Sequence, residues 1–97
     1  MKIIRWDEEK NDWLKRTRGV CFEQVVVRFD QGMILDVVDN PNWEKYPLQK
    51  IAVVEIEGYA YLVPYEQIDD EIVLRTIIPS RRATREYLRG DHEKDQS

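Results

Sequence analysis

The fold is indicated most clearly by residues 49–66, which read QKIAVVEIEGYAYLVPYE. Two runs rich in β-branched and aromatic residues, 49–56 and 59–66, are separated only by Glu57 and Gly58. This spacing is typical of a tight β-hairpin, because Gly58 readily adopts the positive φ that such turns need. The stretch therefore predicts a pair of antiparallel strands.

The hairpin also assigns side chains to the two faces of the predicted sheet. With a two-residue turn, every second residue of the two strands lies on the same face, since side chains alternate along a strand. One face then carries Lys50, Ala52, Val54, Ile56, Tyr59, Tyr61, Val63 and Tyr65, and the other carries Ile51, Val53, Leu62 and Pro64. We expect the face with the lysine and the tyrosines to be partly open.

The residues before the hairpin predict two helices flanked by strands. Asp7 precedes an acidic first turn and Gly19 follows a basic last turn, which predicts a helix over residues 8–18. A second helix is expected from residue 22 to Gly32, because apolar residues recur there at helical spacing. Its apolar stripe comprises Phe22, Val25, Val26, Phe29 and Met33. Strands are expected at residues 2–6 and 34–38.

After the hairpin, residues 72–78 predict a last strand, which Pro79 ends and which a third helix, capped by Ser80, follows. The predicted order is β-α-α-β-β-β-β-α. Helices and strands in this order bury their apolar faces against each other, so we expect a two-layer α+β domain with an antiparallel sheet. We assign residues 1–89 to this single domain and residues 90–97 to a disordered acidic tail.

Composition excludes several classes of protein. The chain of 97 residues has room for one core. Its apolar runs are far shorter than the roughly 20 residues that span a bilayer, and charges follow the N-terminus closely, so we expect a cytoplasmic protein. Cys21 and His92 are the only cysteine and histidine. We therefore expect no disulfide, no metal site and no cofactor.

Basic charge is concentrated near the C-terminus. The whole chain has a net charge of −4, but residues 75–89 carry five arginines against Glu86 alone. Arg81, Arg85 and Arg89 recur at every fourth position, with Arg82 beside them. This stripe predicts a surface that binds RNA phosphates or an acidic partner. The alternative is an ordinary solvated helix face.

Three segments together resemble the BrnT family of toxins, which belongs to the RelE-like superfamily. They are residues 6–11 (WDEEKN), 18–23 (RGVCFE) and 77–85 (IIPSRRATR). The chain departs from the family pattern at Arg18, where histidine is usual, at Cys21, where serine is usual, and in one additional residue between Arg75 and Arg81. The resemblance implies a RelE-like fold and RNA cleavage. It also implies inhibition by a co-encoded antitoxin, often of ribbon-helix-helix type, and contact with operator DNA only through that antitoxin.

RNA cleavage by the ribose 2′-OH needs a base, an acid and a group that stabilises the charged phosphorane. The resemblance implies that Lys, Arg and Tyr can supply these functions without a metal. We therefore expect a catalytic cluster of Lys50, Tyr61, Arg75 and Arg81, and RNA contacts from Tyr65, Arg82, Arg85 and Arg89. The alternative is that both tyrosines are half-buried packing residues and Lys50 is solvated.

Two functions follow from these patterns. The first is an endoribonuclease toxin that cleaves mRNA and is neutralised by its antitoxin. The second is a catalytically silent relative that binds RNA or a protein partner and acts in transcriptional regulation. The register of the last strand discriminates between them, because it decides whether Arg75 lies on the same face as Tyr61 and Lys50.

Overall fold

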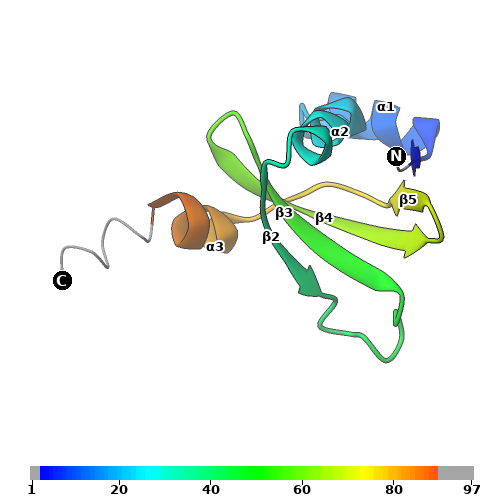
Figure 1. Cartoon of the computed structure of the whole chain (residues 1–97). Helices are drawn as coiled ribbons and strands as arrows, with labels where there is room; N and C mark the ends of the chain where they lie inside the picture. Colours follow the sequence, from blue (N-terminus) through cyan, green and yellow to red (C-terminus); the bar gives the residue numbers. More distant parts are fainter. Residues whose placement is uncertain (1–2, 90–97) are drawn as a thin grey trace.

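The computed structural model describes residues 3–89, and every structural statement below refers to these residues (Figure 1). The tail expected at residues 90–97, with His92, lies outside them. The elements in chain order are β1 (Ile3–Arg5), α1 (Glu8–Thr17), α2 (Phe22–Asp30), β2 (Ile34–Asp39), β3 (Gln49–Ile56), β4 (Tyr59–Ile68), β5 (Glu71–Leu74), β6 (Ile78–Pro79), α3 (Arg81–Ala83) and the π-helical turn η1 (Thr84–Arg89). This is a compact α+β domain. None of the helices is of a length and apolarity that would let it cross a bilayer.

The strands form one sheet in the order β1-β5-β4-β3-β2, and the short β6 pairs with β4 beyond the end of β5. The hairpin prediction is confirmed, since Ile56 pairs with Tyr59 and Lys50 pairs with Tyr65. Glu57 and Gly58 both have positive φ, as a two-residue hairpin turn of this kind requires. The sheet is open and mostly antiparallel.

Two expectations about the sheet were wrong. β1 pairs with β5 in parallel, so the sheet is not entirely antiparallel. The strand expected at residues 72–78 is interrupted, because the chain leaves the sheet after Arg75 and buries Ile77 in the core before β6 returns to β4. Burial of a large aliphatic side chain outweighs a few ladder hydrogen bonds here.

The helix ends follow local signals. The Asp7 side chain accepts a hydrogen bond from the Glu9 amide at 3.1 Å, which confirms the predicted cap of α1. α2 ends at Asp30, two residues before the expected end, and Gly32 then turns the chain with φ +68°. The expected helix over residues 8–18 likewise ends at Thr17.

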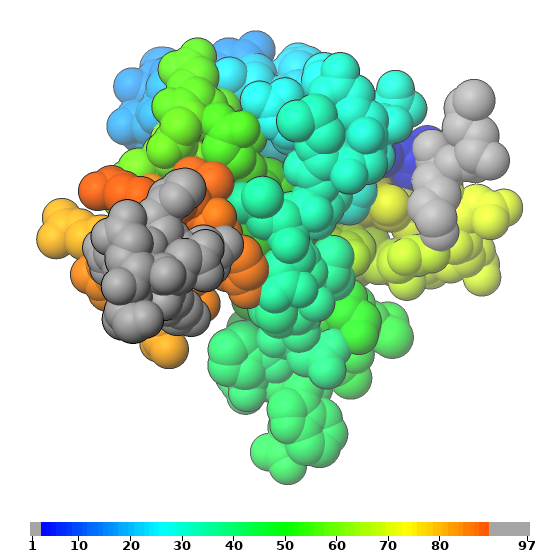
Figure 2. Space-filling view, turned by 60° about the vertical axis from the view of Figure 1, so that its left-hand side comes forward, coloured from blue at the N-terminus to red at the C-terminus, as the bar shows by residue number. Residues whose placement is uncertain are grey.

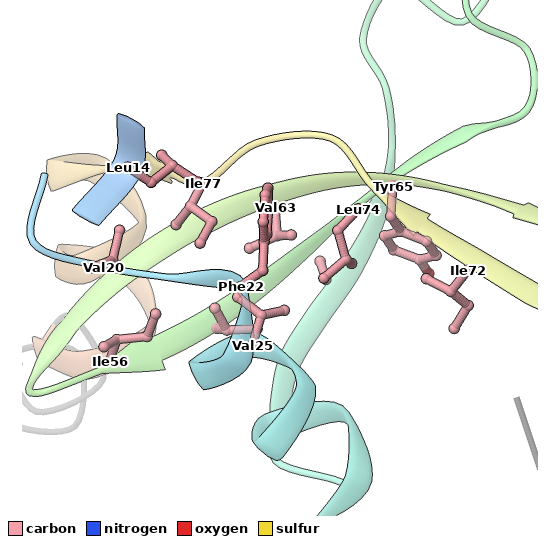
Figure 3. Close-up of a cluster of buried hydrophobic side chains, with 12 residues drawn as sticks. Leu14, Val20, Phe22, Val25, Ile56, Val63, Tyr65, Ile72, Leu74 and Ile77 are labelled. Atoms are coloured by element: carbon pink, nitrogen blue, oxygen red, sulfur yellow. The ribbon is translucent and has the colours of Figure 1, made fainter. Parts of the chain in front are cut away.

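Both helices α1 and α2 pack on the same face of the sheet (Figure 1). Figure 3 shows the buried side chains that join them to the strands. We call this the helix-covered face; its buried members are Ala52, Val54, Ile56, Val63, Tyr65, Ile72 and Leu74. It is the face that the sequence analysis expected to be partly open. That expectation holds only in part: Leu14 of α1 and Phe22 and Val25 of α2 cover the middle of this face, whereas the part around Tyr65 and Ile72 borders a cavity.

The opposite face carries Ile51, Val53, Leu62 and Pro64 and is covered only at one end. There α3 and η1 place Ala83, Tyr87 and Leu88 against Val53, Ala60 and Leu62. Helices thus lie on both faces of the sheet, so the expected two-layer arrangement gains a third, short layer at this end.

Candidate functional site

The candidate site is the C-terminal segment of α3 and η1, which we call the arginine surface and define as Arg81, Arg82, Arg85 and Arg89. All four side chains are exposed. Arg82 forms an ion pair with Glu86 at 3.1 Å, and within residues 3–89 the other three form no salt bridge. In Figure 2 this segment (orange) lies at the surface with β2 (blue-green) beside it. The exposure expected from the sequence is confirmed.

Buried contacts hold this segment against the sheet. The Ser80 hydroxyl accepts a hydrogen bond from the Ala83 amide, which confirms the predicted cap. Thr84 is completely buried; its hydroxyl accepts from the Ala60 amide and donates to the Ser80 carbonyl oxygen, both at 2.8 Å. The arginines therefore project from a backbone that is tied to β4.

A groove of about 220 Å³ lies beside α3 and η1 where they meet the sheet. Its lining is Val38, Val53, Leu62, Ser80, Arg82, Ala83, Glu86 and Tyr87. The Tyr87 hydroxyl closes one side by donating a hydrogen bond to the Asp36 carboxylate of β2. This hydrogen bond to a carboxylate raises the pKa of Tyr87. The groove is thus mainly apolar, with the Arg82–Glu86 ion pair at its edge.

Lys50 and Tyr65 are cross-strand partners, as the register predicted. Lys50 forms an ion pair with Asp39 of the neighbouring β2, and this hydrogen bond raises the pKa of the lysine. Tyr65 is only 7% exposed and packs edge-on against Phe29, with ring centroids 5.6 Å apart. Burial raises the pKa of Tyr65. Tyr65 is thus part of the core, contrary to an open RNA-binding position.

Tyr61 is half-buried, packs against the core and forms an edge contact with Tyr59. Burial raises its pKa as well. Its backbone pairs with Pro79, so Arg81 follows two residues after the partner of Tyr61. Strand pairing thus brings the backbones of Tyr61 and Arg81 near each other, but the Tyr61 side chain packs on the helix-covered face, whereas α3, which carries Arg81, packs on the opposite face.

Arg75 lies on the opposite face of the sheet from Lys50. Leu74 pairs with Tyr65 and is buried on the helix-covered face, so the next side chain points to the other side. There Arg75 forms an ion pair with Glu66. The expected cluster of Lys50, Tyr61 and Arg75 is therefore not assembled, because the strand register separates it.

These pKa directions limit the chemistry of the expected cluster. A raised pKa keeps Lys50 charged and keeps both Tyr61 and Tyr65 protonated near neutral pH. None of the three is poised to accept a proton as a general base. Within residues 3–89, no three side chains of His, Cys, Asp or Glu converge as metal ligands would.

Two residues have structural roles that the sequence pattern did not predict. Asn11 is completely buried and accepts a hydrogen bond from the Phe22 amide at 2.8 Å, so it satisfies the first amide of α2, while the Gln24 side chain accepts from the amide of the N-cap residue Cys21. The guanidinium of Arg18 lies over the Trp13 ring and donates to the Ile77 carbonyl oxygen at 2.6 Å. The only sequence signal for the buried role of Asn11 is that it is a polar residue on the apolar side of α1. No sequence signal indicates that Arg18 contacts Ile77.

Comparison with known proteins adds no identification. No protein-family model, no curated protein and no solved structure matches the chain. The candidate site therefore rests on the geometry of its own residues.

Proposed function

We propose that this domain binds RNA through the arginine surface, as the toxin half of a toxin–antitoxin pair. The observation that carries the proposal is the gathering of Arg81, Arg82, Arg85 and Arg89 on one exposed segment of a chain whose net charge is −4. Guanidinium groups match phosphate oxygens in shape and charge, and Arg keeps its charge at all physiological pH values.

The anchoring of the segment supports the same proposal. Like charges on one short helical segment repel each other, and an anionic ligand relieves that repulsion. Because Thr84 and Ala83 are buried against β4 and β3, the arginines meet a ligand from a fixed backbone. Less conformational entropy is then lost on binding than from a flexible tail.

Cleavage of the bound RNA is the second part of the proposal and comes from the resemblance to BrnT toxins. Arg81 and Arg85 are suited to stabilise charge on the phosphorane. Tyr61, the tyrosine expected to transfer the proton, packs on the helix-covered face, away from α3 and η1, and burial raises its pKa, so it is not placed or tuned to act as the base. This observation favours the second candidate function, a relative that binds RNA and its partner without cleaving.

The partner in either case is a co-encoded antitoxin, which we propose to be of ribbon-helix-helix type. The groove beside η1 suits an apolar side chain, and the exposed Arg81 and Arg85 of the same segment suit neighbouring acidic ones. An acidic antitoxin segment and an RNA strand would compete for the arginines, because both present oxyanions. The antitoxin would then neutralise the toxin by occupying the arginine surface in place of RNA.

Growth and cleavage assays test the proposal. Expression of the full chain should arrest bacterial growth, and purified protein should cleave RNA in EDTA and leave 2′,3′-cyclic phosphate ends. Arg81→Ala/Arg85→Ala should lower the cleavage rate roughly 10²-fold. The matched control is Lys15→Ala/Arg16→Ala, which removes the same charge from exposed positions of α1.

The outcomes separate the two candidates. RNA binding without cleavage or growth arrest would assign the chain to the silent class. Cleavage that disappears on chelation would contradict the metal-independent mechanism. Unchanged RNA binding by the well-folded arginine variant would overturn the site itself.

A further inference from the structure

A larger cavity, of about 640 Å³, lies on the helix-covered face beyond the end of α2. Its lining is Ile4, Trp6, Val26, Phe29, Asp30, Tyr65, Gln67 and Ile72. In Figure 3, Tyr65 and Ile72 lie side by side at the end of the core farthest from Leu14. The cavity thus adjoins the end of the core that Tyr65 and Ile72 form.

The short helices explain why this part of the sheet is uncovered. β4 runs on to Ile68 and pairs there with β5, which in turn pairs with β1. α2 ends at Asp30, and Gly32 then directs the chain to β2 at the other edge of the sheet. No element of residues 3–89 continues over this space, and it is of the size of typical ligand sites.

The walls of the cavity combine three aromatic rings with three polar groups. Trp6, Phe29 and Tyr65 supply the rings. The exposed Asp30 carboxylate, the exposed Gln67 amide and the Tyr65 hydroxyl supply the polar groups, and none of the three takes part in the ion pairs within residues 3–89. A ligand would find all three without a competing ion-pair partner in this part of the chain.

The charge of the cavity is negative. Asp30 is its only charged lining residue. It lies in the last turn of α2, where the terminal carbonyl groups of the helix add partial negative charge. An acid at this end of a helix is unfavourable by itself, and a bound cation would relieve it. Lys50, the cation next to Tyr65, is already paired with Asp39.

We propose that this cavity binds an organic cation with an apolar or aromatic body. The ammonium or guanidinium group would lie at the Asp30 carboxylate, and the body would pack on the rings of Trp6, Phe29 and Tyr65. Aromatic rings attract cations through their quadrupole, and this attraction grows as the site is desolvated. The proposal does not depend on RNA binding, because it uses none of the arginine surface.

The test uses phenethylammonium as the probe and 2-phenylethanol as its neutral counterpart of similar size. Titrations of the full chain at neutral pH, followed by NMR chemical shifts, should show saturable binding of the cation. The alcohol should bind about tenfold more weakly, the factor that corresponds to one charge-assisted contact. Shifts should be largest for the lining residues.

Variants locate the site. Asp30→Asn should weaken binding of phenethylammonium about tenfold, whereas Asp12→Asn, an exposed acid on α1, should leave it unchanged. Val26→Phe, which fills the cavity, should abolish binding in a protein that still melts cooperatively. Equal binding of the alcohol, or unchanged affinity in Asp30→Asn, would overturn the proposal.

A second probe distinguishes the source of the cation. Nα-acetyl-lysine amide presents the same ammonium group on the side chain of a protein. Tighter binding of this probe would assign the cavity to a partner's side chain, and tighter binding of phenethylammonium would assign it to a free amine. Absence of binding by either probe up to about 10 mM, the limit of weak specific association, would overturn the inference.

Discussion

The two faces of the sheet differ in what covers them. On the helix-covered face, α1 and α2 bury Phe22, Leu14 and Val25 completely against the strands (Figure 3). On the opposite face, the short segment of α3 and η1 covers one end and leaves β-strand side chains such as Val38 exposed. Packing that stabilises the fold is therefore concentrated on the helix-covered face. The opposite face carries the arginine surface and the groove beside η1, which are available to a ligand.

The largest effect should come from the helix-covered face. Phe22→Ala removes a ring with no exposed surface and should lower the free energy of unfolding by about 3–5 kcal/mol. Val38→Ala, on the opposite face and 40% exposed, should cost less than about 1 kcal/mol. Urea unfolding followed by circular dichroism measures both. Similar losses of unfolding free energy for the two variants would show that the two faces contribute equally to stability, which would contradict this account.

Asn11 should give the next largest effect. Asn11→Ala leaves the buried Phe22 amide without its acceptor and should cost about 1–3 kcal/mol. Asn42→Ala, an exposed asparagine of the loop after β2, is the matched control and should change stability by less than about 0.5 kcal/mol. Thermal melts of the two variants are the measurement, and an undiminished melting temperature for Asn11→Ala would contradict this role.

Local signals explain how much of the fold the sequence predicted. The hairpin turn at Glu57 and Gly58, the cap at Asp7 and the cap at Ser80 depend on residues within a few positions of each other. Each was placed correctly, because local hydrogen bonding and positive φ decide such features. Together these signals predicted the order of the elements except for β6.

The errors arose where distant segments meet. Which face α1 and α2 would cover depends on β1 crossing to the far edge of the sheet, beside β5, which no local pattern specifies. The catalytic cluster failed for a similar reason. Arg75 pairs with Glu66 and Lys50 with Asp39, each from a neighbouring strand. The arginine surface was predicted because its four members lie on one short segment.

Thr84 links the stability of the opposite face to its binding. Thr84→Val keeps the shape but removes both hydroxyl hydrogen bonds, which leaves the Ala60 amide unpaired and should cost about 1–2 kcal/mol. Hydrogen exchange of η1 should accelerate, and RNA affinity should fall with it. Thr84→Ser retains the hydroxyl and is the control. Faster exchange in both variants alike would show that packing, not hydrogen bonding, holds the segment.

Glu23 should give a small effect that depends on pH. The hydrogen bond from Asn11 holds the pKa of this exposed carboxyl below its usual value. The ionised form is therefore favoured by folding, and its contribution is present above the usual pKa and lost as pH falls through the lowered one. Glu23→Gln should be slightly less stable than wild type at neutral pH and equal to it in acid. A difference that grows in acid would contradict the sign.

The central claim is that the arginine surface binds RNA phosphates, and the salt dependence of binding tests it most directly. The affinity of the full chain for a single-stranded RNA should be titrated from low to physiological salt. Each lost phosphate contact should flatten the slope of log affinity against log salt by about 0.7, so Arg81→Ala/Arg85→Ala should flatten it by about 1.4. Lys15→Ala/Arg16→Ala should leave the slope unchanged. The same slope for wild type and the arginine variant, with both well folded, would contradict the account.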